Sequence, residues 1–125
     1  MDIFSNVKSL RHTNAHGEIN FYKIEKGSVD TADFTDFIDK TASGGFIVGH
    51  SESGHHHILE AEGATVLERE MNGMKVLYAI LENPGEIKQD ASAPHEKQVI
   101  EAGEYIIGAS QEFDPFLQQA RRVND

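Results

Sequence analysis

The chain has 125 residues and contains neither cysteine nor tryptophan. Without cysteine it can form no disulfide, no thiolate metal site and no cysteine nucleophile. Basic residues are scarce, because 11 lysines and arginines stand against 21 aspartates and glutamates, for a formal net charge of -10. Nucleic acids and anionic membranes both need basic surfaces, so we expect neither as a partner. The acidic balance suits high solubility, a saline setting or a basic protein partner.

Long apolar runs are missing too. No segment approaches the roughly 20 apolar residues of a membrane span, and residues 1–5 lack the basic start of a signal peptide. We therefore expect a soluble protein. Its length favours a single domain, which can bury roughly two-thirds of the surface that the unfolded chain exposes.

Short apolar segments separated by turn residues predict a mainly β fold. Asn72-Gly73 is the strongest hairpin signal in the chain, because both residues tolerate positive φ. This turn sets two facing pairs, Leu67 with Tyr78 and Thr65 with Ile80. Further strands are expected over residues 17–25, 98–101 and 104–108, and a second hairpin over residues 46–62. About seven short strands with close turns indicate a small β-sandwich or barrel, cupin-like or jelly-roll-like.

Helical and irregular segments are expected around this β domain. Phe34, Phe37 and Ile38 form an apolar stripe at helical spacing, which predicts one short helix near residues 31–40. Residues 86–95 are polar and loop-like. The expected organisation is an N-terminal arm or short helix over 1–17, a β domain over 18–112 and a C-terminal helical tail over 113–125.

The segment from His50 to His57 holds four of the seven histidines. With a two-residue turn at 53–54, Glu52 faces His55 and His50 faces His57. Side chains alternate along a strand, so these four groups would share one face of the hairpin. An odd number of turn residues would break the arrangement. Three imidazoles and a carboxylate suit a divalent transition metal such as Zn, Fe, Mn or Ni.

The same face continues inward, so it would run from an apolar core to a polar mouth. Its inner members are Phe46, Val48, Leu59 and Ala61. His56 would lie on the opposite, solvated face, while His95 could add a ligand from a distant loop. The candidate metal ligands are therefore His50, Glu52, His55, His57 and His95. Solvated histidines, a subunit contact and a proton switch remain open as alternatives for this cluster.

Four stretches of the chain carry a resemblance to phage proteins. They are Gly45-Phe-Ile-Val-Gly-His-Ser-Glu-Ser-Gly-His-His-His, Ala102-Gly-Glu-Tyr, Gln111-Glu-Phe-Asp-Pro and Arg122-Val-Asn-Asp. A group of small proteins from tailed bacteriophages and prophages has similar stretches, with a richer second histidine segment where this chain has only His95-Glu96. More distantly, His55-x-His57 followed by Glu62 resembles the first half of the cupin metal motif, although the flanking glycines are not at cupin spacing.

The phage resemblance implies a phage origin, and a small β-rich domain with an extended arm and an acidic surface suits a non-enzymatic virion component. We expect a capsid-decorating or cement protein that bridges capsid subunits, with the major capsid protein or another virion protein as partner. It would be a homo-oligomer, with a trimer as one option, located in the virion and in the host cytoplasm before assembly. The alternative is a cupin-like metalloenzyme that uses the histidine cluster. A host protein bound through the acidic surface is a third possibility.

Overall fold

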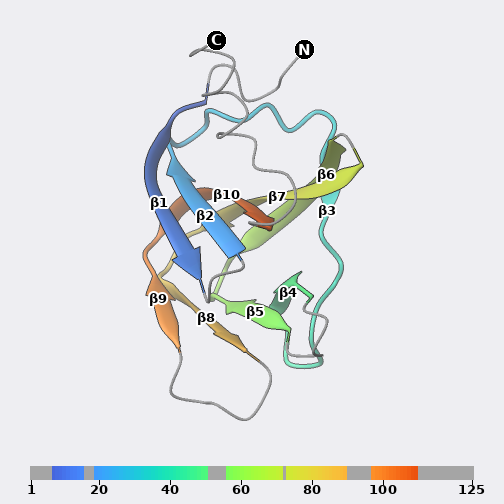
Figure 1. Cartoon of the computed structure of the whole chain (residues 1–125), viewed down its shortest axis with the longest axis vertical. Coiled ribbons are helices and arrows are strands. Elements are labelled where there is room, and N and C mark those ends of the chain that lie inside the picture. Colours follow the sequence, from blue (N-terminus) through green and yellow to red (C-terminus); the bar gives the residue numbers. More distant parts are fainter. Residues whose placement is uncertain (1–6, 16–18, 51–55, 72, 90–96, 110–125) are drawn as a thin grey trace.

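A computed structural model of the chain describes residues 7–15, 19–50, 56–71, 73–89 and 97–109. Within these residues, ten strands form two antiparallel sheets (Figure 1). The larger sheet has the order β1 (Ser9–Ala15), β2 (Ile19–Ile24), β10 (Gly103–Ala109), β7 (Met74–Leu81), β6 (Thr65–Met71) and β3 (Thr35–Asp36). The smaller sheet has the order β4 (Phe46–Gly49), β5 (His57–Glu60), β8 (Gly85–Gln89) and β9 (Gln98–Ile100).

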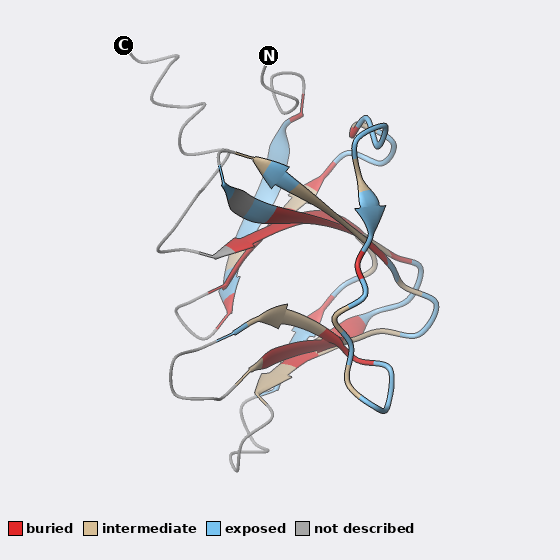
Figure 2. Ribbon diagram, turned by 90° about the vertical axis from the view of Figure 1, so that its right-hand side faces the viewer, coloured by how far each residue is buried: buried red, intermediate tan, exposed pale blue. Residues whose placement is uncertain are grey.

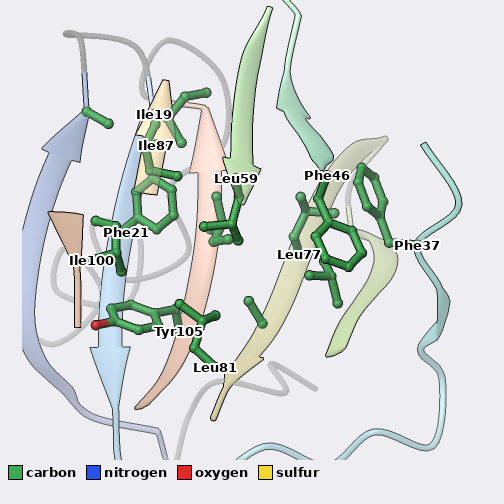
Figure 3. Close-up of a cluster of buried hydrophobic side chains, with 14 residues drawn as sticks. Ile19, Phe21, Phe37, Phe46, Leu59, Leu77, Leu81, Ile87, Ile100 and Tyr105 are labelled. Carbon is green, nitrogen blue, oxygen red and sulfur yellow. The ribbon is translucent and has the colours of Figure 1, made fainter. Parts of the chain in front are cut away.

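The two sheets lie face to face as a small β-sandwich, which confirms the predicted fold class. Figure 2 shows the two layers with buried residues on both. One apolar cluster fills the space between them, and Phe21, Leu77 and Tyr105 of the larger sheet meet Leu59 and Ile87 of the smaller one (Figure 3). Within the described ranges there is no helix, and so none that could cross a bilayer.

A second apolar cluster covers the other face of the larger sheet. Its sheet members include Tyr22, Val76, Tyr78 and Ile106. The connection that follows β2 covers part of this face, since Val29 belongs to the cluster. The strands β2, β7 and β10 are therefore apolar on both sides, which explains their nearly continuous hydrophobic sequences.

The hairpin of β6 and β7 follows its prediction residue by residue. Leu67 pairs with Tyr78 and Thr65 pairs with Ile80. Gly73 has a φ of 79°, a conformation that glycine adopts without steric cost, whereas Asn72 lies outside the described residues. The alternation expected in the first strand is also confirmed, because Ile19 and Phe21 join the cluster between the sheets and Tyr22 and Ile24 join the outer one.

The expected helix near residues 31–40 is wrong. The segment instead contains the two-residue strand β3, which pairs with β6 at the edge of the larger sheet. Phe34 packs on the outer cluster, Phe37 is buried between the sheets, and Ile38 is 83% exposed. The three residues do not form one stripe, because the extended chain passes around the sheet edge and presents them to different sides.

Two further expectations need correction. Residues 85–89 form strand β8 rather than a loop, and Ile87 is fully buried. The short helix considered for residues 1–17 is replaced by β1 over the described part of that segment. The proposed helical tail over 113–125 lies outside the described residues, as do residues 90–95.

Candidate site at the histidine hairpin

The histidine hairpin is formed by β4 and β5, and its register differs from the prediction. Phe46 pairs with Leu59 and Ile47 pairs with Ile58, but the next pair is Gly49 with His57. Val48 is therefore an extra residue on β4, and the strand contains a β-bulge. The predicted register pairs Phe46 with Ala61 and His50 with His57. The observed pairs are two residues out of that register before the bulge and one residue out after it, so the predicted pairing of His50 with His57 is wrong.

His57 belongs to the interior of the sandwich. Its exposed fraction is 0%, and alternation along β5 places it on the same side as the buried Leu59. A Cβ added to Gly49 would lie 3.3 Å from His57 Cδ2 and would overlap the end of the Ile19 side chain from the larger sheet. Gly49 thus lets the imidazole and Ile19 approach the β4 backbone closely, and His57 acts as a core residue rather than as part of an open mouth.

His50 lies at the surface beyond the bulge. Its Nε2 atom is 2.7 Å from Asp39 Oδ2, and about half of its side chain is exposed. Its ring contacts His56, with 4.5 Å between the ring centroids and an interplanar angle of 72°. The predicted position of His56 on the face opposite His50 is therefore also wrong.

The structure therefore brings His50 together with Asp39 and His56, and places His57 in the core. The other candidate ligands Glu52, His55 and His95 lie outside the described residues. Among the described residues, no group of three histidines or carboxylates is arranged to hold a metal ion.

The inner face of the hairpin follows its prediction better than the histidines do. Phe46 and Leu59 are buried in the cluster between the sheets, and Val48 and Ala61 pack against it. On the opposite face Glu60 Oε1 forms an ion pair with Lys88 Nζ of β8 at 2.9 Å. The apolar residues of the hairpin thus contribute to the core, and the ion pair of Glu60 links β5 to β8.

A buried carboxylate on the outer face of the larger sheet was missed by the sequence reasoning. Glu104 is 6% exposed and accepts hydrogen bonds from the hydroxyl of Tyr78 and, at 3.0 Å, from the Gly27 amide. Burial, assisted by the hydrogen bond and the charge of Glu104, raises the pKa of Tyr78 well above its ordinary value. The only sequence signal was an acid at the start of an otherwise apolar strand.

Two polar clusters lie on strand β1. On the outer face, Asn20 Oδ1 is 2.6 Å from His12 Nε2 and accepts a hydrogen bond from Asn14 Nδ2 at 2.9 Å. The ring of His12 stacks on that of Tyr22, with centroids 4.7 Å apart. Elsewhere on the strand, Arg11 binds Glu101. A hydrogen bond from Lys23 and the charges of Arg11 and Lys23 lower the pKa of Glu101.

Comparison with family models, with curated proteins and with solved structures gave no match to this chain. The function is therefore inferred from the sequence resemblance and from the geometry of the fold.

Proposed function

We propose that the chain is a non-enzymatic component of a phage virion, a capsid-decorating or cement protein that bridges capsid subunits. The observation that best supports this proposal is the position of His57. The most distinctive motif of the sequence places this imidazole inside the sandwich at 0% exposure, where it contributes to packing. A motif that contributes to the core builds the fold, as a binding module needs.

The shape of the molecule agrees with this role. A small sandwich with an acidic surface can sit between larger subunits, and the described strands leave one long sheet edge open for pairing with another chain. The proposal includes oligomerisation and a capsid protein as partner.

The direct test is quantitative mass spectrometry of purified particles from the phage or prophage that encodes the chain. The proposal expects this chain in a fixed ratio to the major capsid protein, retained through a density gradient. Particles assembled without the chain should lose their contents at a lower temperature. Complete absence of the chain from purified particles would eliminate the proposal.

The alternative of a cupin-like metalloenzyme needs a ligand set different from the expected one. His50 does not pair with His57, and His57 is fully buried. Elemental analysis of tag-free protein purified without chelator separates the two functions. A metal content near one per chain, lost on replacing His50 but retained on replacing His12, would favour the enzyme.

A further inference from the structure

The two sheets end in four edge strands, and β1 differs from the other three. The edges β3, β9 and β4 contain two, three and four residues, and β4 is also bulged. β1 has seven residues and lacks proline. Its pairing with β2 is irregular between Ser9 and Arg11 and regular from Arg11 to Ala15. Short or bulged edges resist the addition of another strand, whereas a long regular edge offers a row of unpaired backbone groups. Among the described strands, β1 pairs with β2 alone (Figure 1).

The β1 edge is also free of the acidic charge that marks the rest of the chain. None of the 21 acidic residues falls between Asp2 and Glu18. The guanidinium of Arg11 is neutralised within its own copy, since its Nη2 atom lies 2.6 Å from Glu101 Oε1. Two bodies of charge -10 repel each other at most orientations. Contact through β1 brings together two strands that carry no acidic residue of their own.

The outward side chains of β1 are already held in place. His12 and Asn14 share the side-chain oxygen of Asn20, which is itself only 6% exposed, and His12 is stacked on Tyr22. Ordering side chains on association opposes binding, so side chains that are fixed beforehand lower this cost. Leu10 on the same strand is 56% exposed and would gain from being covered.

We propose that β1 pairs antiparallel with β1 of a second copy of this chain, about a two-fold axis at Thr13. In this register Thr13 faces Thr13 of the second copy, His12 faces the second copy's Asn14, and Arg11 faces the second copy's Ala15. Threonine pairs are favourable across antiparallel strands. An axis at Arg11 would oppose two guanidinium groups, and an axis at His12 would oppose two imidazoles, so Thr13 gives the best self-complementary centre.

This pairing joins the larger sheet of one copy to the larger sheet of the other as one continuous sheet, and it forms a closed, isologous dimer. It goes beyond the proposed virion role, because a dimer in solution is required whether or not the chain is found in particles. Absence from particles would therefore eliminate the virion proposal and leave the dimer standing.

The first test is a charge exchange at the axis, followed by sedimentation analysis of the full chain at micromolar concentrations. The wild type should be a dimer. Thr13→Lys and Thr13→Glu should each weaken dimerisation at least tenfold, because like charges then face each other across the axis. An equimolar mixture of the two variants should recover the dimer. Lys and Glu at Val99, which is 69% exposed on the β9 edge, are the matched controls and should leave the dimer unchanged.

The second test uses the absence of cysteine from the natural chain. Facing residues of adjacent strands are close enough for a disulfide. Thr13→Cys, a nearly isosteric change, should yield a covalent dimer under mild oxidation much faster than Val99→Cys. This variant keeps the proposal testable if a charged residue at position 13 prevents folding, which thermal unfolding would reveal.

Three results would overturn the proposal. A wild-type monomer throughout the concentration range is the first, and a trimer is the second. The third is equal cross-linking of the two cysteine variants. If the wild type is monomeric and Thr13→Lys abolishes binding to purified capsids, the edge belongs to a capsid strand instead of a second copy.

Discussion

The hairpins β6–β7 and β4–β5 are both predicted by the alternation of side chains, yet only the first keeps the expected register. Between β6 and β7 the pairs run without a break from Thr65–Ile80 to Met71–Met74. Between β4 and β5 one extra residue enters at Val48, and all pairs beyond it change parity. An Asn-Gly turn fixes the register of a hairpin by its own geometry, whereas a polar histidine segment leaves the register to the packing beneath it.

The packing beneath β4 explains the difference. Gly49 lies where the His57 ring and the tip of Ile19 come close to the backbone. Any side chain at position 49 would occupy that space, so the glycine and the bulge let an imidazole enter the core. Glycine inside a strand often marks a bulge or a close approach of this kind. The signal was thus present in the sequence, immediately before His50.

The largest expected difference is between the core residue His57 and the surface residue His50 when each is replaced by alanine. His57→Ala should lower the free energy of unfolding by about 3 kcal/mol, because it leaves a cavity in the core. His50→Ala should cost less than about 1 kcal/mol, because its pair with Asp39 is exposed. Urea unfolding measures both. Equal costs would contradict the different placement of the two rings.

Filling the space at Gly49 should have the next largest effect. Gly49→Ala is expected to destabilise the protein by about 2 kcal/mol through overpacking. Ile19→Val removes the methyl group that a new Cβ would meet, so the double variant should be more stable than the sum of the single changes predicts. Strict additivity in this double-mutant cycle would mean that position 49 has free space.

Tyr78 tests the hairpin of β6 and β7. The pairing of Tyr78 with Leu67 is predicted by the sequence, whereas its hydrogen bond to Glu104 is not. Tyr78→Phe removes a hydrogen bond from buried Glu104 and should cost about 1–3 kcal/mol at neutral pH. The folded state raises the pKa of Tyr78 above its ordinary 10.0. Its stabilisation is therefore complete below pH 10 and is lost as the pH rises beyond that value.

Stability measured against pH checks this sign. The wild type should lose stability above pH 10 more steeply than Tyr78→Phe does. Burial also raises the pKa of Tyr105, so the variant should keep part of the slope and Tyr105→Phe serves as the matched control. Identical alkaline slopes for wild type and Tyr78→Phe would contradict the buried pair.

The smallest expected effect is at the turn of the β6–β7 hairpin. Gly73 has a φ of 79° and open space around its Cβ position, so Gly73→Ala is opposed by backbone conformation alone. The cost should be about 1 kcal/mol, with the register unchanged. Asparagine at position 73 should cost less, because it tolerates this conformation better. Alanine and asparagine of equal stability would indicate a different turn.

The sequence was informative where apolar residues alternate and misleading where polar residues belong to strands. The sequence of strand β8 predicts a loop because Glu86 and Lys88 flank a single apolar residue, Ile87. Both charges lie on the outer face of the smaller sheet, where they pair with Lys97 at 3.8 Å and with Glu60 at 2.9 Å. Such cross-strand partners come from distant parts of the chain, so a local pattern cannot show them.

The helix expected near residues 31–40 failed for a related reason. The spacing of Phe34, Phe37 and Ile38 fits a helix, but a chain that turns around a sheet edge can place the same residues on two faces and in solvent. The outer face of the larger sheet is covered in part by the connection after β2, through Val29 and Phe34, without a helix. Tertiary packing thus overrode the local preference.

The most direct test of the account is a nuclear Overhauser measurement across the β4–β5 hairpin of the isotope-labelled chain. The bulged register predicts contacts of the Gly49 α-protons with the His57 ring, and of the His50 ring with the His56 ring. Contacts that join the His50 ring to the His57 ring, with Gly49 opposite Ile58, would show the register of a two-residue turn and contradict the bulged one.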